Sequence, residues 1–139
     1  MRFEASIDIA APAERVFAVY SDVERWPEWT RSVTSVERLD DGPLRVGSRA
    51  RVRQPRLPTA VWEVTELVPD RSFTWVARGP GIVTTGSHVV TPLDGDGVNA
   101  TAALEQAGPL GSLMGRLTKR LTNEYLETEV RALKARFEE

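Results

Sequence analysis

Between residues 33 and 106 the sequence alternates short strand-like runs with turns, and this alternation limits the fold more than any other feature. The turns are clusters of glycine, proline and aspartate, such as Asp40-Asp41-Gly42-Pro43 and Gly79-Pro80-Gly81. Such short connections join neighbouring strands as hairpins, because a parallel pair needs a crossover of about a dozen residues or more. The pattern therefore predicts an antiparallel sheet, whose strands in this region are 33–39, 48–54, 60–67, 72–78, 82–91 and 98–106.

The first 29 residues predict one more strand and two short helices. Apolar and polar side chains alternate over 3–9, which is the period of a strand with one buried face. Pro12 suits the first turn of a helix, and apolar residues at helical spacing extend that helix to about residue 21. Asp22 can cap a second helical turn, which closes at Trp26-Pro27-Glu28-Trp29. The predicted sheet thus has seven strands.

Residues 110–139 contain no proline, and no glycine after Gly115, which predicts one helix of about 25 residues or more. Its two halves present different apolar faces. The first face comprises Leu110, Leu113, Met114, Leu117, Leu121 and Tyr125, and the second comprises Leu126, Val130, Leu133 and Phe137. We expect the first half to cover the concave sheet over a pocket. The second half would pack against the strand edges and the N-terminal helices.

The composition excludes several classes of function. The length of 139 residues predicts one domain, 1–139, and 41% hydrophobic with 27% charged residues is typical of a soluble globular protein. A net charge of −2 provides no global field for nucleic acid or an anionic membrane, although local basic patches remain possible. No run has the length of a membrane span or a signal peptide, so integral membrane association is not expected and the cytoplasm is the default location.

Metal and cofactor sites have little support. The chain has no cysteine and a single histidine, which removes disulfides, thiolate nucleophiles and the ordinary transition-metal sites. Asp94-Gly95-Asp96-Gly97 resembles the start of a calcium loop, but the acid expected at position twelve, Glu105, falls inside a predicted strand. A hairpin turn explains the segment better. We therefore expect no cofactor and no metal.

Four segments carry a family resemblance. They are Ile9-Ala10-Ala11-Pro12-Ala13-Glu14-Arg15-Val16-Phe17, Ser21-Asp22, Trp26-Pro27-Glu28-Trp29 and Gly108-Pro109-Leu110-Gly111. In this order they resemble the START-like, birch-pollen-allergen-like superfamily (SRPBCC), and within it the bacterial polyketide cyclase/dehydrase and lipid-transport group. The resemblance implies an α+β helix-grip fold, a curved antiparallel sheet wrapped on a long C-terminal helix with a cavity for hydrophobic or aromatic molecules. Members range from cyclases to lipid carriers and receptors, so the fold does not choose a chemistry.

The candidate site residues lie on the predicted sheet. His88, the single histidine, shares a strand face with Gly86 and Val90, and we expect this face to be concave. There it could contact a ligand's phenol or ketone, or transfer a proton. Alternatively, its imidazole only forms a hydrogen bond with a neighbouring hydroxyl, or is exposed to solvent. Trp62 and Trp75, on adjacent strands, are equally compatible with pocket lining and core packing.

The strand patterns leave two orientations open. On strand 60–67 either Trp62 or Glu63 faces the ligand, and Tyr125 could direct its hydroxyl to the cavity or to water. On strand 48–54 the side chains of Arg49, Arg51 and Arg53 share one face, and burying three unpaired charges would cost too much, so that face meets solvent. A basic strip for an anionic carrier or headgroup is the less favoured interpretation.

Three hypotheses follow. The first is binding of a small hydrophobic or aromatic molecule, lipid-like or polyketide-like, with no nucleic-acid partner. The ligand-binding candidates are Trp29, at the rim beside the small helices, and Val52, Trp62, Trp75, His88, Leu113, Leu117, Leu121 and Tyr125. The second is a polyketide aromatase/cyclase or dehydratase that uses His88 as acid/base, assisted by Tyr125 or Glu63. The third is a homodimer that pairs through the face containing Leu126 and Val130.

Overall fold

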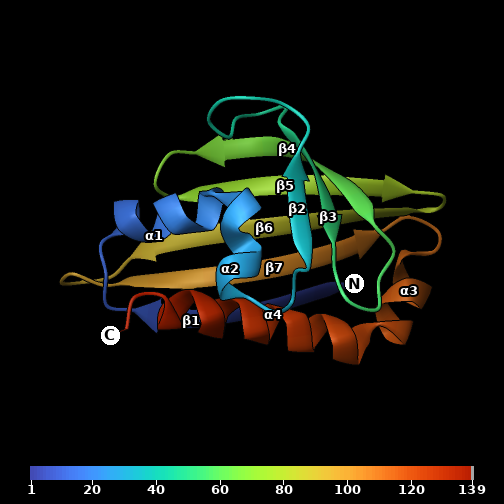
Figure 1. Ribbon diagram of the computed structural model, residues 1–139. Helices are drawn as coiled ribbons and strands as arrows, with labels where there is room; N and C mark the ends of the chain where they lie inside the picture. Colours follow the sequence, from blue (N-terminus) through green and yellow to red (C-terminus); the bar gives the residue numbers. More distant parts are fainter. Residues whose placement is uncertain (139) are drawn as a thin grey trace.

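A seven-stranded antiparallel sheet forms most of the protein (Figure 1). The computed structural model describes residues 1–138, and its strands follow the order β1-β7-β6-β5-β4-β3-β2. The strands are β1 (Arg2–Ile9), β2 (Ser35–Arg38), β3 (Arg49–Arg53), β4 (Ala60–Val68), β5 (Ser72–Gly79), β6 (Ile82–Pro92) and β7 (Val98–Ala107). Consecutive strands from β2 to β7 are neighbours, as the short connections require.

The helices lie together on one side of this sheet, and β2 and β3 run steeply across the direction of β5 to β7 (Figure 1). After β1 come α1 (Ala13–Ser21), the single 3-10 turn η1 (Val23–Arg25) and α2 (Trp26–Trp29); after β7 come α3 (Gly111–Leu117) and α4 (Lys119–Ala135). The predicted helix-grip α+β fold is confirmed. Within residues 1–138, none of the helices is both long enough and apolar enough to cross a bilayer.

The register of the strands determines which side chains face the helices. Phe73 lies opposite His88 and Trp75 lies opposite Gly86, so the expected face of β6 is the inner one. A Cβ atom on Gly86 would lie 3.1 Å from the Trp75 indole, so the glycine allows the ring to lie flat across the neighbouring strand. Phe73 and Val90 are fully buried in the main core.

The strand β4 presents Trp62 inward and Glu63 outward, which resolves the alternative left by its sequence. Trp62 lies opposite Ala50 and is buried, whereas Glu63 is half-buried and approaches Arg49 at 4.0 Å. A shift of register between Val64 and Glu66 adds a residue to the strand without disturbing this assignment. The arginines of β3 all lie on the exposed outer face, as predicted.

The C-terminal helix is broken, and here the predicted packing is wrong. The helix stops at Leu117 and restarts at Lys119. Its first part, α3, packs on the sheet through Gly111 and Gly115 rather than through leucines. A Cβ atom on Gly111 would lie 2.9 Å from the backbone oxygen of Gln106, so no larger residue fits this edge of the helix. The opposite face, with Leu113 and Leu117, consequently points to solvent.

The second part, α4, packs as expected. Leu126 and Val130 pack with Phe3 of β1 and Ala102 of β7 in a second buried cluster, while Leu133 is fully buried in the main core. This face is therefore occupied within the chain, and the structure removes the basis for a homodimer that pairs through it.

Candidate functional site

A small cavity lies between α4 and the inner face of the sheet. Its volume is about 60 Å³, which is room for a few water molecules at roughly 10–15 Å³ each. Its lining residues are Trp26, Val33, Val52, Gln54, Trp62, Trp75, Gly86, His88, Ala103, Leu104 and Glu129. The walls thus come from α2, the inner strands and α4.

Three indole rings form the apolar wall of the cavity. The ring centroids of Trp62 and Trp75 are 5.6 Å apart, and those of Trp26 and Trp75 are 5.5 Å apart. The Trp26 Nε1 atom donates a hydrogen bond of 2.9 Å to the backbone oxygen of Tyr20, which satisfies this buried donor and holds the ring in place. Planar, polarisable surfaces of this kind suit an aromatic or otherwise flat ligand.

The buried imidazole of His88 is one of three polar side chains that line the cavity, the others being Gln54 and Glu129. It stacks on Phe73 with ring centroids 4.2 Å apart, and its Nδ1 atom lies 3.2 Å from the Phe73 backbone oxygen. Because a carbonyl can only accept, the geometry assigns the proton to Nδ1 and leaves Nε2 as an acceptor. Burial lowers the pKa of His88 to about 3, against the smaller opposing effect of this hydrogen bond. The imidazole is therefore neutral at physiological pH.

The second polar group is Glu129, which the sequence analysis missed. The Tyr20 hydroxyl donates a 2.6 Å hydrogen bond to its Oε2 atom, and both residues are buried. Burial raises the pKa of Glu129 to about 7, and this hydrogen bond opposes the rise. The pKa of Tyr20 lies well above its usual value because of burial and the neighbouring carboxylate. Glu129 follows Leu126 by three residues and precedes Leu133 by four, a position on the apolar face that could have indicated its burial.

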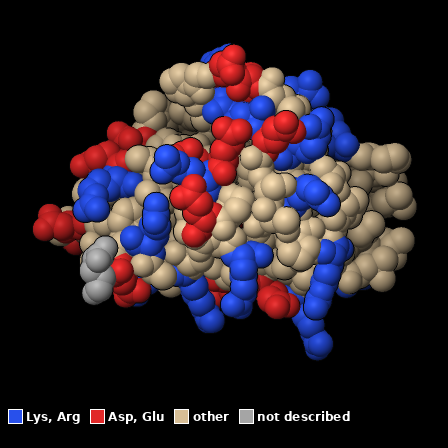
Figure 2. All heavy atoms as spheres, in the orientation of Figure 1, with Lys and Arg blue, Asp and Glu red and all other residues tan. Residues whose placement is uncertain are grey.

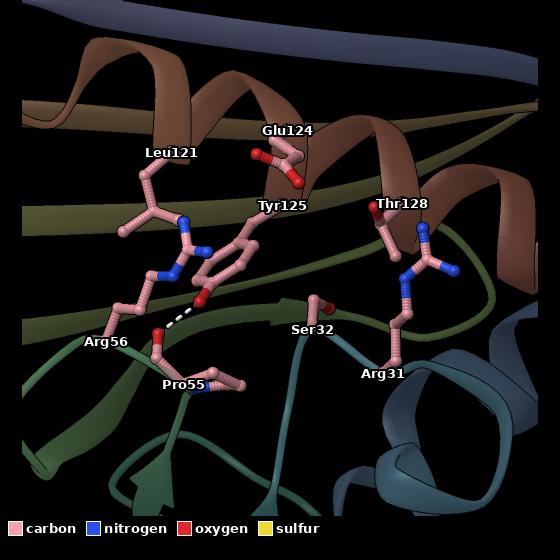
Figure 3. A pocket seen from close by; sticks show the side chains of 8 residues that line it. All are labelled: Arg31, Ser32, Pro55, Arg56, Leu121, Glu124, Tyr125 and Thr128. Carbon is pink, nitrogen blue, oxygen red and sulfur yellow. Dashed lines mark hydrogen bonds between the residues drawn. The ribbon is translucent and has the colours of Figure 1, made fainter.

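An outer groove of about 160 Å³, shown in Figure 3, is lined in part by chain neighbours of the residues that line the cavity. Chain neighbours line the two spaces on three segments: Ser32 and Val33, Pro55 and Gln54, and Thr128 and Glu129. The Tyr125 hydroxyl donates a hydrogen bond to the backbone oxygen of Pro55, so it ties α4 to the β3–β4 loop at this point (Figure 3). Gln54 donates to the backbone oxygen of Ser32 at 3.2 Å and links the two loops beneath.

The structure divides the predicted site residues into three groups. Val52, Trp62, Trp75 and His88 line the cavity. Leu121 and Tyr125 line the outer groove, and Trp29 lines a second groove beside it, of about 530 Å³. Leu113 and Leu117 lie outside all these spaces, with 56% and 72% of their surface exposed, because α3 docks by its glycine edge. Glu63, one of the two residues predicted to assist His88 in catalysis, lies on the outer face of the sheet, away from the cavity.

The described residues, 1–138, hold no group of three or more side chains arranged to bind a metal ion. The cavity instead contains one neutral imidazole, one carboxyl group and the Gln54 amide among otherwise apolar walls. This arrangement can orient a small molecule through hydrogen bonds, and the carboxyl group can exchange a proton near neutral pH.

Solved structures with the same fold come from several bacteria. A START superfamily protein from Mycobacterium smegmatis is 20% identical with a TM-score of 0.77, and 99% of this chain and 97% of that chain are covered. A protein from Thermus thermophilus is 22% identical, with the same TM-score and coverage. An aromatase/cyclase from a Streptomyces species is 16% identical with a TM-score of 0.79, covering 99% and 93%. At these identities the likeness establishes the fold alone.

No curated protein matches the sequence. The model of the family described as polyketide cyclase/dehydrase and lipid transport matches residues 1–138, which is nearly the whole chain. The chain therefore belongs to the polyketide cyclase/dehydrase and lipid transport family.

Proposed function

We propose that the protein binds a small, flat, largely apolar molecule that carries a hydroxyl group, in the cavity between α4 and the sheet. The observation that carries the proposal is that two buried polar groups, His88 and Glu129, line one cavity with three tryptophans. The Nε2 atom of His88 is an acceptor, so it favours a ligand that donates, such as a phenol. Family membership supports the general class of a hydrophobic ligand.

The cavity alone is too small for such a ligand, so the ligand must also use space from the outer groove. Common ligand pockets hold roughly 300 Å³ or more, whereas this cavity holds about 60 Å³ and the groove about 160 Å³. We infer that the contact between Tyr125 and Pro55 opens when the ligand binds and joins the two spaces. This contact is a single hydrogen bond at an exposed position, which is a small barrier to opening.

A titration with 2-naphthol, a bicyclic phenol, tests this proposal. The indole N–H signals of the four tryptophans are resolved by nitrogen-15 NMR and assigned with single Trp→Phe variants. Binding in the cavity should shift the signals of Trp26, Trp62 and Trp75 more than that of Trp29, which lies in the second groove. A shift confined to Trp29, or none at saturating probe, would contradict the proposal.

Two matched variants localise the binding. Val52→Ile adds one methylene at the cavity wall, whereas Val36→Ile adds the same group at a neighbouring buried position that does not line the cavity. We expect the first to weaken 2-naphthol binding at least about threefold and the second to leave it unchanged. Tyr125→Phe should speed both association and release, because it keeps the ring but removes the hydrogen bond to Pro55.

A second candidate function, dehydration or cyclisation of a polyketide-like ketone, is favoured by one observation. Glu129 has a pKa of about 7 and lines the cavity, so its two protonation states are both populated near neutral pH. Its carboxylate can remove the proton beside a ketone, and the resulting acid can protonate the departing hydroxyl as water. His88, with a pKa of about 3, is better suited to accept a hydrogen bond than to transfer a proton.

The two functions are separable by experiment. If the protein is a catalyst, Glu129→Gln should reduce turnover of a β-hydroxy ketone by about a hundredfold or more. The variant should still bind 2-naphthol. His88→Gln should weaken substrate binding more than it slows the conversion of bound substrate. A protein that binds 2-naphthol and shows no turnover above the Glu129→Gln variant is a binding protein.

A further inference from the structure

The end of the molecule at α3 exposes a continuous group of large apolar side chains. Leu110, Leu113, Met114 and Leu117 are all exposed on α3 or at its start. Together they are called the α3 patch. Its orientation is fixed, because the opposite edge of α3 lies against Gln106 through Gly111 and Gly115.

The α3 patch lies beside the turn between β5 and β6. The Leu110 backbone N–H donates a 2.8 Å hydrogen bond to the backbone oxygen of Gly81, so the start of α3 lies against this turn. Figure 2 shows this right-hand end of the molecule as a broad surface largely without charged side chains. Contiguous exposed apolar surface of this kind marks an interaction site.

Positive charge borders the patch. From Gln106 to Asn123 the sequence contains Arg116, Lys119 and Arg120 and no acidic residue, although the whole chain has a net charge of −2. Within residues 1–138, none of these three cations forms a salt bridge. The cations are therefore concentrated where the apolar side chains are exposed.

We propose that the α3 patch docks the protein on the surface of an anionic lipid bilayer. Leucine and methionine on one face of a helix, bordered by lysine and arginine, match an apolar interfacial layer and its negative headgroups. A second copy of the chain fits this surface less well. A symmetric pairing through α3 would bring Arg116, Lys119 and Arg120 of both copies together without any acid to neutralise them.

Co-sedimentation with lipid vesicles tests the proposal on the whole protein. Vesicles of phosphatidylcholine alone are compared with vesicles containing about 30% phosphatidylserine. We expect binding to the anionic vesicles that weakens as salt is added, and little binding to the neutral ones. The double variant Leu113→Glu, Leu117→Glu should reduce the apparent partition coefficient about tenfold or more. Both positions are exposed, so the fold should tolerate the change.

Two further variants sharpen the test. Val46→Glu places one new acid at an exposed apolar residue of the β2–β3 loop and should bind the vesicles like the wild type. Lys119→Gln with Arg120→Gln should weaken binding and flatten its salt dependence. The fold of each variant is checked by circular dichroism and its melting temperature.

Four results would overturn the proposal. One is no binding to anionic vesicles by the wild type, and another is unchanged binding by the folded double leucine variant. The third is a dimer, measured by light scattering, that the leucine substitutions dissociate, since this would assign the α3 patch to a second copy. Equal binding to soluble polyglutamate, insensitive to the leucine substitutions, would likewise assign the cations to an acidic macromolecule and overturn it.

Discussion

Glu129 and His88 impose opposite pH dependences on the stability of the fold. Burial raises the pKa of Glu129 from 4.5 to about 7 and lowers the pKa of His88 from 6.5 to about 3. Between pH 4.5 and 6.5 the folded protein thus keeps Glu129 protonated, while the unfolded chain ionises it. Over the same range the unfolded chain protonates His88, while the folded protein keeps it neutral. The changes of the two contributions with pH therefore cancel in this range, and their sum stays nearly constant.

Removing one group should expose the pH dependence of the other. In Glu129→Gln only the His88 contribution remains, which is full above pH 6.5 and is lost as the pH falls toward 3. In His88→Gln only the Glu129 contribution remains, which is full below pH 4.5 and is lost as the pH rises through 7. Two pH units at about 1.4 kcal/mol each give about 3 kcal/mol. Acidification from pH 6.5 to 4.5 should therefore destabilise Glu129→Gln, and stabilise His88→Gln, by about 3 kcal/mol relative to the wild type.

Urea unfolding followed by tryptophan fluorescence at pH 4.5, 5.5 and 6.5 measures these differences. The control is Glu66→Gln, which removes an exposed carboxylate from β4 and should leave the pH profile of the wild type unchanged. The sign of the two slopes is the critical result. If the profiles of Glu129→Gln and His88→Gln run parallel to that of the wild type, the two groups are not buried in the assigned protonation states.

Three further changes probe the packing around the site. Tyr20→Phe removes the hydroxyl that donates to the buried carboxyl of Glu129, so urea unfolding should report a loss of about 1–3 kcal/mol; a loss near zero would contradict that contact. Gly86→Ala would place a Cβ atom 3.1 Å from the Trp75 indole and should cost about 1–3 kcal/mol, with a change in near-ultraviolet circular dichroism. An unchanged spectrum would show that the ring does not lie there. Gly111→Ala should destabilise the docking of α3, seen as faster amide hydrogen exchange in α3 but not in α4.

The fold followed from the sequence because its determinants are local. Alternating side chains and short turns determine strands and hairpins directly, and the register within each hairpin then leaves little freedom. The orientation of Trp62 could not be decided in this way, since apolar residues occur on both faces of β4. Its partner Ala50 on β3 decided it, and that pairing is a property of the sheet rather than of the strand.

The candidate site was only partly predictable for the same reason. Val52, Trp62, Trp75 and His88 share the inner face of the sheet, so strand periodicity brought them together. Glu129 was missed because a carboxyl group on an apolar helix face is costly to bury unless a distant partner such as Tyr20 compensates it. That partner lies 109 residues away in the sequence.

The sequence by itself determined the order of strands and helices, the antiparallel sheet and the inner face of β6, because side-chain period and turn chemistry act between near neighbours. Only the tertiary structure decided how α3 packs. Its leucines predicted a buried face, yet the backbone of Gln106 admits only Gly111 at the contact, so the leucines turn outward. Hydrophobic periodicity shows which face of a helix is apolar. Which face is buried depends on the shape of the surface against which the helix packs.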